Sequence, residues 1–427
     1  MKVWELEKEF DSLIGFIKAG REGKKRDIRD IILKIKEDVI ARGDEALVGF
    51  SLAFDGWDRA YPLKLTDKEI EEAASRVSRK DLSVLKGMIK NVTSYHRGQK
   101  MPKRTYRKKG LLVKEEPVPV EAALVYVPGG TAAYPSSLIM GAIPAQIAGV
   151  KNIYVSTPGR GGRINDHVAA AAKLLGTSNV YRVGGAQAIY AFAYGTSTIP
   201  AVDMIVGPGN AYVEEAKRDV YGTVGIDIPA GPTELVVLST EEGQAPKEVV
   251  LDMFSQAEHD ELASVGLFSS SRRYINEVAA QIKETLGRNP RSATIGKALE
   301  QNGYLVYFEN IGLAIDAINR IAPEHMELLG DESIAESVLY PGIIYVGPHT
   351  SVAMGDYYIG TNHILPTGGA GRFMGGLSVD RFTKRKVVVK IDGTFIERFG
   401  TNAAELSRIE GLFAHGEAIK ARKEPQR

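Results

Sequence analysis

The chain has 427 residues, which is long enough for more than one domain with a buried core. Its 54 Lys and Arg residues nearly balance 53 Asp and Glu residues, so a net charge of +1 gives no reason to expect nucleic acid as a partner. Cysteine is absent, which excludes disulfides, thiolate metal ligands and a cysteine nucleophile.

The first hundred residues have helical patterning. Ile and Val recur at the spacing of one helical face from Ile28 to Val39, and Gly43 fits the end of that helix. We therefore predict an N-terminal helical arm over residues 1–105 that packs on the second of two α/β domains. The N-terminus has no signal-peptide core, and no stretch reaches the roughly 20 apolar residues of a membrane span. We accordingly expect a cytoplasmic protein with no membrane partner. The basic run over residues 103–109 is interpreted as a solvated connector.

A first α/β domain is predicted over residues 106–232. Four short apolar runs end in glycine-rich turns and begin about 25–30 residues apart, the spacing of strand, crossover helix and strand; they start at Ala123, Ile153, Val180 and Met204. Runs without polar alternation fit a parallel sheet that is buried on both faces. In such sheets ligands bind beyond the carboxyl ends of the strands, where these turns would lie.

A second α/β domain is predicted over residues 233–380, with strands near residues 234–238, 264–268, 304–308 and 343–347. Helical segments separate these strands, and the one over residues 247–258 leads to Gln256 and His259. Residues 381–427 are predicted to form a C-terminal tail with a strand over 387–391 and a helical end. The fold class is therefore α/β, with two Rossmann-like parallel-sheet domains, a helical arm and a helical tail.

Histidines in the second half of the chain lie close to carboxylate and amide residues. Four of the seven histidines, each with a carboxylate or carboxamide residue within seven positions, lie in the segments SQAEH, APEHMEL, GDYYIGTNH and EGLFAH: His259, His325, His363 and His415. Gln256 and His259 would share one face of a helix and could bind one ion, although a surface or capping role is the alternative.

Glu324 and His325 are adjacent after Pro323, which is compatible with a helix start. They are either two acid–base groups with separate tasks or a capping Glu beside a partly buried His.

Two glycine turns are candidates for close approach to a nucleotide. They are Gly184-Gly185-Ala186-Gln187 and Gly207-Pro208-Gly209-Asn210, where Gln187 and Asn210 would supply hydrogen bonds. The chain contains no G-x-G-x-x-G, so the usual dinucleotide fingerprint is missing and the residues alone do not name the cofactor.

Eight motifs occur in a fixed order between residues 125 and 415: VYVPGG, VGGAQA, GPGNAYVEEAKR, AGPTEL, SQAEH, APEHMEL, GDYYIGTNHILPTGGAGRF and EGLFAH. This ordered set resembles the histidinol dehydrogenase family. The resemblance implies a zinc-dependent oxidation of L-histidinol to L-histidine through L-histidinaldehyde, in which two NAD molecules accept four electrons. It also implies an intertwined homodimer with shared active sites.

The same resemblance assigns roles to individual residues. Glu324 and His325 would be the catalytic acid–base residues, and one zinc ion per subunit would be held by Gln256, His259, Asp356 and His415. NAD would contact Tyr126, Gln187 and Asn210. The substrate would contact Thr233, Gln256, His259, His325, Asp356, His363, Glu410 and His415. The C-terminal tail would carry Glu410 and His415 into the site of the partner subunit.

Two positions depart from the usual pattern of that family. Thr233 stands where Ser is common, and Asp260-Glu261-Leu262 replaces a proline-containing segment. A related zinc and NAD dehydrogenase for another small primary alcohol is therefore the alternative function, and a catalytically silent zinc protein is a second. His363 and Glu410 suit a cationic imidazole and amine, which favours histidinol.

Overall fold

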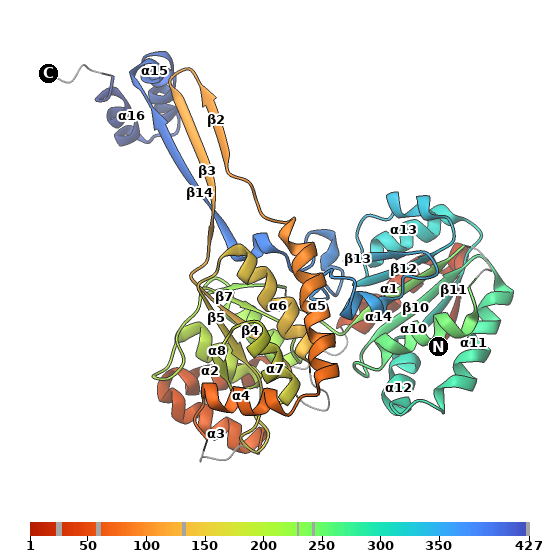
Figure 1. Cartoon of the computed structure of the whole chain (residues 1–427). Coiled ribbons are helices and arrows are strands. Elements are labelled where there is room, and N and C mark those ends of the chain that lie inside the picture. Colours follow the sequence, from red (N-terminus) through yellow and green to blue (C-terminus); the bar gives the residue numbers. More distant parts are fainter. Residues whose placement is uncertain (23–27, 57–60, 130–133, 229, 241–243, 424–427) are drawn as a thin grey trace. The chain divides into compact units, whose positions relative to one another are not determined.

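The structure is a computed structural model of the chain (Figure 1). It describes residues 1–22, 28–56, 61–129, 134–228, 230–240 and 244–423. Gly130, the last residue of VYVPGG, lies outside these ranges. The chain divides into two compact units, of which the first comprises Met1–Gln99 and Val120–Phe382 and the second comprises Lys100–Pro119 and Thr383–Arg427.

The first unit contains a five-stranded parallel sheet in the order β6-β5-β4-β7-β8. Its strands are β4 (Ala122–Tyr126), β5 (Asn152–Ser156), β6 (Val180–Tyr181), β7 (Met204–Val206) and β8 (Gly225–Ile226). The predicted apolar runs therefore form the strands, and the glycine-rich turns follow their carboxyl ends.

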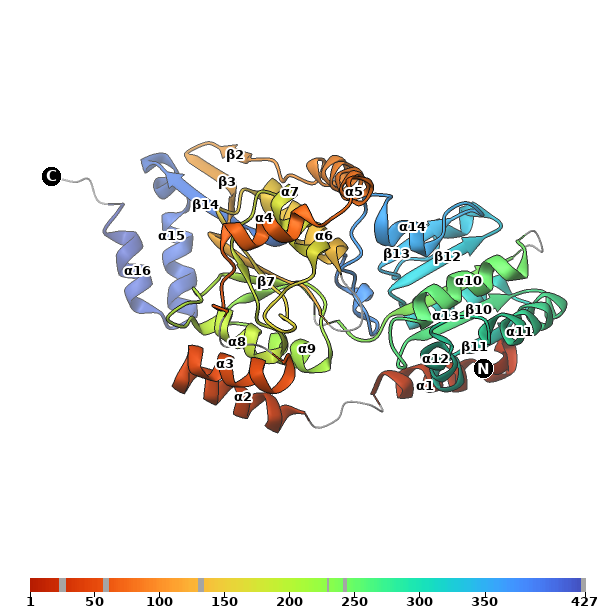
Figure 2. The same ribbon diagram turned by 60° about the horizontal axis from the view of Figure 1, so that its bottom comes forward.

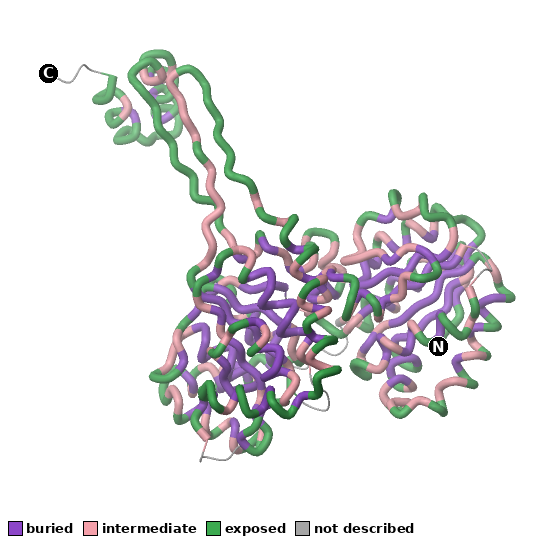
Figure 3. The backbone as a smooth tube through the Cα atoms, in the orientation of Figure 1, coloured by how far each residue is buried: buried purple, intermediate pink, exposed green. Residues whose placement is uncertain are grey.

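Helices cover both faces of this sheet, so its strands are buried (Figures 2 and 3). Successive residues of β4 point to opposite faces, and Val125 packs in one core while Leu124 packs in the other. The first core includes residues of α4 (Asp67–Ser75), α5 (Arg79–Arg97), α6 (Pro135–Ala148) and α7 (Asp166–Leu174). The opposite core includes residues of α2 (Arg29–Arg42), α3 (Asp44–Phe54), α8 (Gly185–Tyr194) and α9 (Ala211–Val220).

A second, six-stranded parallel sheet also belongs to the first unit, in the order β1-β11-β10-β9-β12-β13. Its strands are β1 (Lys2–Glu5), β9 (Glu234–Ser239), β10 (Ser264–Ser269), β11 (Tyr304–Tyr307), β12 (His325–Leu329) and β13 (Ile343–Val346). One face packs on α1 (Leu6–Glu22) and α13 (Ile311–Ile321). The other packs on α10 (Pro246–Ala257), α11 (Arg272–Leu286), α12 (Ser292–Asn302) and α14 (Val352–Tyr357).

The N-terminal hundred residues are mostly helical and contribute to the cores of both sheets, not only to that of the second. β1 and α1 pack with the second sheet, whereas α2 to α5 pack with the first sheet. Helix α2 ends at Gly43, whose φ of 55° is easily reached only by glycine. The four predicted domain ranges stay a prediction, because the compact units do not separate the two sheets.

The second unit is an antiparallel sheet in the order β14-β3-β2 with two helices. Its elements are β2 (Arg104–Lys108), β3 (Leu111–Pro119), β14 (Thr383–Ile391), α15 (Gly393–Ile409) and α16 (Phe413–Lys420). The basic run over residues 103–109 is not a connector, because most of it forms β2, but it is solvated as predicted, since all residues of β2 are exposed. Among the described residues, no helix combines the length and apolar character that crossing a membrane requires.

Candidate active site

The two expected acid–base residues lie at the amino end of β12, inside the second sheet. Glu324 directly precedes this strand, and His325 is its first residue, beside Leu235 of β9 and Ile343 of β13. Only 7% of Glu324 and 3% of His325 are exposed. The predicted helix start after Pro323 is wrong, because the apolar run HMELL is paired with a strand on each side and is fully buried.

The Glu324 carboxylate is held by hydrogen-bond donors of Glu234, the first residue of β9, and of Thr233, which precedes that strand. Its Oε2 atom accepts a hydrogen bond from the Glu234 backbone N–H at 3.1 Å. The Thr233 hydroxyl lies 2.7 Å from the same oxygen and 2.8 Å from Gln256 Oε1, and its single proton serves one of them at a time. Burial raises the pKa of Glu324 well above its ordinary value, and these hydrogen bonds oppose the shift. A carboxyl group with a raised pKa is suited to general-base chemistry near neutral pH.

The His325 ring is fixed in one tautomer by its hydrogen bond. Its Nδ1 atom lies 3.2 Å from the Glu234 carbonyl oxygen, and because a carbonyl only accepts, Nδ1 carries the proton. Burial lowers the pKa of His325, so its ring is kept neutral. The Nε2 atom is buried and makes no hydrogen bond with any described residue, and Asp356 Oδ1 lies 3.7 Å away. His325 therefore presents an unused proton acceptor.

Two of the four expected metal ligands, Gln256 and Asp356, lie near this acceptor. Gln256, in the last turn of α10, donates a hydrogen bond from Nε2 to Asp356 Oδ2 of α14 at 3.0 Å. His259 follows the end of α10 and is exposed, so the predicted common helix face does not apply. A positive charge on His259 would lower the pKa of both His325 and His363. His363 donates from Nδ1 to the Asp356 carbonyl oxygen at 2.8 Å.

The side-chain oxygen and nitrogen atoms of these residues are of the chemical type that binds a divalent cation. Amide and carboxylate oxygens and imidazole nitrogens are ligands of zinc, and the unpartnered Nε2 atom of His325 lies beside them. Within the described parts of the chain, no group of three or more His, Asp or Glu residues is placed to hold a metal ion. Glu410 and His415 belong to the second unit, where both are exposed. The expected ligand His415 therefore belongs to a different compact unit from Gln256, His259 and Asp356.

The expected cofactor residues follow strands of the first sheet. Tyr126 ends β4, and its buried hydroxyl accepts a hydrogen bond from the Gly185 N–H at 3.0 Å. Gln187 is buried in the first turn of α8. Asn210 caps α9, accepting hydrogen bonds through Oδ1 from the N–H groups of Tyr212 and Val213. Its side-chain amide nitrogen is not used in this cap.

Two charged residues at this site were missed in the sequence. Arg21, in the last turn of α1, donates to both carboxylate oxygens of Glu234 at 2.7 and 2.8 Å, and also to the Ile321 carbonyl oxygen at 2.8 Å. Glu234 directly precedes the apolar residues LVVL of β9, and a charged residue at that place was a signal of a buried ion pair. Arg21 gave no signal, because 213 positions separate it from Glu234.

Arg21→Met is expected to lower the free energy of unfolding by about 3 kcal/mol, because it leaves the buried Glu234 carboxylate unpaired. Denaturant unfolding measures this change. Arg76→Met is the matched control, since Arg76 forms a similar bidentate pair with Asp166 that is much more exposed. The control should cost less than about 1 kcal/mol. Equal losses in the two variants would contradict the burial argument.

The site combines a buried carboxyl group whose pKa is raised, a neutral histidine with a free ring nitrogen, and nearby carboxylate and amide oxygens. Together with the parallel sheets, these groups define an α/β enzyme with an acid–base centre. A family model described as histidinol dehydrogenase matches residues 19–423. The chain belongs to the histidinol dehydrogenase family, as its ordered motifs predict, and is an oxidoreductase.

Individual relatives agree with this assignment over nearly the full length. The chain is 40% identical to a histidinol dehydrogenase of Geobacter sulfurreducens and 41% identical to one of Geobacillus kaustophilus, each over 97% of both chains. The crystal structure of histidinol dehydrogenase from Elizabethkingia anophelis superposes with a TM-score of 0.91 at 32% identity, covering 98% of this chain and 96% of that one. The predicted mixed α/β fold with parallel sheets is thus confirmed.

Proposed function

We propose that this enzyme oxidises L-histidinol to L-histidine through L-histidinaldehyde, with two NAD molecules as hydride acceptors, in the last steps of histidine biosynthesis. The observation that carries the proposal is the pair of buried groups at the start of β12. His325 offers a free Nε2 lone pair, and Glu324 is a separately held carboxyl group. Two oxidations with a hydration between them need two such proton acceptors.

The two groups have separate tasks in this proposal. His325 Nε2 takes the proton of the alcohol as hydride leaves the adjacent carbon for the first NAD. Glu324 then takes a proton from the water that adds to the aldehyde, and the hydrate gives a second hydride to a second NAD. Both groups are buried, so they exchange protons with little competition from bulk water.

We propose Gln256, His259, Asp356 and His415 as the ligands of one zinc ion per subunit. Bound zinc would supply a positively charged centre that orients the imidazole and amine of the substrate. The hydrogen bond between Gln256 and Asp356 supports this choice of ligands, because it joins a side chain of α10 to a side chain of α14. Substrate contacts are proposed for Thr233, Gln256, His259, His325, Asp356, His363, Glu410 and His415.

The proposed NAD site is the carboxyl edge of the first sheet, at Tyr126, Gln187 and Asn210. In this sheet β4 is central, with β5 and β6 on one side and β7 and β8 on the other. We regard this order, and the equivalent order of β9 to β13, as Rossmann-like, and ligands in such sheets bind where the strand order reverses. Tyr126 and the turn after β7 flank that position.

We also propose an intertwined homodimer in which the second unit completes the partner's site. This unit carries Glu410 and His415 and leaves large apolar side chains exposed, as interfaces do; they include Val389, Leu406, Ile409, Leu412 and Phe413, with between 45% and 71% of each exposed. A monomer would leave this apolar surface in water.

Purified enzyme is expected to form two NADH per L-histidinol consumed, and a chelator should abolish both oxidations until zinc is restored. Absorbance of NADH and product analysis measure the ratio. No turnover of histidinol, with turnover of another small primary alcohol, would favour the alternative function and would point to the extra methyl of Thr233. No turnover of any alcohol would indicate a catalytically silent zinc protein.

A further inference from the structure

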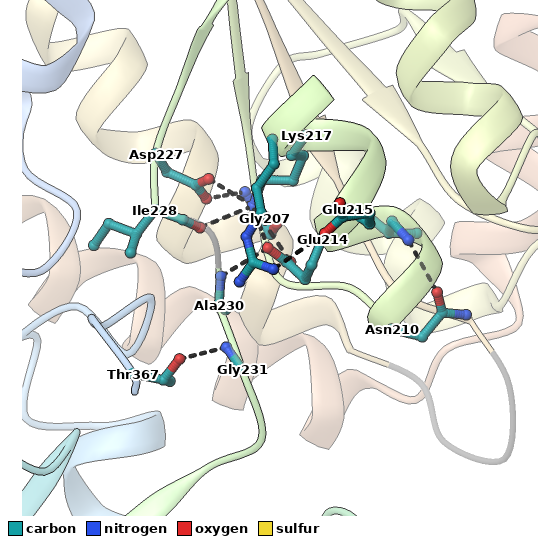
Figure 4. Close-up of polar contacts among 12 residues, drawn as sticks. Gly207, Asn210, Glu214, Glu215, Lys217, Asp227, Ile228, Ala230, Gly231 and Thr367 are labelled. Atoms are coloured by element: carbon teal, nitrogen blue, oxygen red, sulfur yellow. Dashed lines mark hydrogen bonds and ion pairs between the residues drawn. The ribbon is translucent and has the colours of Figure 1, made fainter. Parts of the chain in front are cut away.

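Helix α9 carries a lysine that is fully buried beneath the proposed cofactor turn (Figure 4). Lys217 Nζ lies 2.6 Å from Asp227 Oδ1 and 3.4 Å from the carboxylate of Glu214. The same ammonium donates to the carbonyl oxygens of Gly207 at 3.0 Å and Ile228 at 3.2 Å. It therefore joins the turn after β7 to the segment after β8.

Both polar groups of the Gly207 residue are held by this cluster. Its N–H donates to Asp227 Oδ2 at 2.6 Å, and its carbonyl oxygen accepts from Lys217. Gly207 has a φ of 114°, and a Cβ atom there would lie 2.1 Å from the Tyr126 carbonyl oxygen. The turn that leads to Asn210 is thus fixed against the end of β4.

The other end of the cluster leads to the acid–base site. Glu214 Oε2 accepts a hydrogen bond from the Ala230 N–H at 2.7 Å, and the Gly231 N–H donates to Thr367 Oγ1. Thr233 follows two residues later and contacts Gln256 and Glu324. The segment between the two sheets is therefore anchored immediately before it enters the site.

Electrostatics indicates that this cluster does more than stabilise the fold. Burial alone would lower the pKa of Lys217, but Asp227 and Glu214 outweigh it and raise the pKa, so the ammonium stays charged. Burial raises the pKa of Glu214 to about 7. Buried ion pairs are often no more stabilising than apolar side chains of equal size, because desolvation offsets their attraction. Unlike apolar side chains, these groups fix the direction of backbone N–H and C=O groups.

We propose that Lys217, Asp227 and Glu214 are positioning residues that hold the cofactor turn and the Thr233 segment as one unit. The inference rests on the proposed NAD contact at Asn210. Asp227 aligns the cofactor side through Gly207, Glu214 aligns the substrate side through Ala230, and Lys217 couples the two.

Three single variants and steady-state kinetics test this assignment. Asp227→Asn should raise KM for NAD about tenfold, the effect of misplacing a hydrogen-bonded contact, with KM for histidinol nearly unchanged. Glu214→Gln should instead lower kcat/KM for histidinol about tenfold. Glu215→Gln is the matched control, because Glu215 is the neighbouring carboxylate of α9 and pairs with Arg218 on the surface. The control should keep native constants. Folded variants with a lower Tm but native kinetic constants would overturn the proposal.

A second pair of variants covers the case in which Glu214→Gln does not fold. Thr367→Val removes the acceptor for Gly231 and should lower kcat/KM for histidinol, whereas Thr367→Ser keeps the hydroxyl and should restore it. Equal activity of the two would overturn the substrate-side link.

Asn210→Ala distinguishes an error in the proposed NAD site from an error in the proposed positioning role. If it leaves KM for NAD unchanged, the cofactor site itself is misassigned. If it raises KM for NAD while folded Asp227→Asn does not, the positioning role fails.

Discussion

His325→Asn is expected to lower kcat for oxidation of histidinol about a thousandfold, the usual contribution of a general base. Asn can still donate to the Glu234 carbonyl oxygen in place of Nδ1, but it has no atom that replaces the Nε2 lone pair. Glu324→Gln should leave this first oxidation within about tenfold of native and should slow conversion of the aldehyde about a thousandfold. Single-turnover formation of NADH, with histidinol and histidinaldehyde as separate substrates, measures both steps.

Glu324→Gln is also matched in shape, because its amide oxygen can still accept from the Glu234 N–H. A general loss of packing should therefore be small in both variants, and their Tm values check this. Equal losses of both steps in the two variants would contradict the separate tasks proposed for Glu324 and His325.

A heterodimer of one His415→Ala subunit and one His325→Asn subunit is expected to regain about half of the native activity, although each homodimer is inactive. If His415 serves the partner's site, one of the two sites in this heterodimer receives only native residues. Co-expression with two different affinity tags isolates the heterodimer. Self-contained subunits would show no recovery.

The matched control is a heterodimer of Glu324→Gln and His325→Asn subunits. Both residues lie at the start of the same strand, so each site retains one damaged residue whichever tail it receives. This heterodimer should convert histidinol to histidine no faster than its parent homodimers. Recovery in the control would show that mixing itself, rather than a shared site, restores activity.

Most of the two parallel sheets could be predicted from the sequence, because strands buried on both faces are continuous apolar runs. The strand near 304–308 is an example. The helix end at Gly43 could also be predicted, because glycine commonly ends a helix. The β2–β3 pairing could not be predicted, because the residues of β2 are exposed and charged on both faces and show no apolar period. β8, with two residues, is too short for a pattern.

The site could be predicted only in part from the sequence, because its residues lie far apart along the chain. Local spacing placed Gln256 near His259, but the Gln256–Asp356 hydrogen bond joins residues 100 positions apart. The motif resemblance, not periodicity, brought those residues together. The acid–base pair was also placed at a helix start, because Pro323 is a common first helical residue while the strand that follows is defined by its two neighbours in the sheet.

Main-chain atoms of Glu234, in β9, contact both Glu324 and His325, which matters for redesign of this enzyme. The backbone N–H of Glu234 holds Glu324, and its carbonyl oxygen holds His325. The spacing of the two proposed proton acceptors thus depends in part on main-chain atoms, which no side-chain substitution removes. Substitution of His363, a proposed substrate contact that is hydrogen-bonded to neither group, should therefore leave their alignment unchanged, whereas Thr233 contacts Glu324 itself.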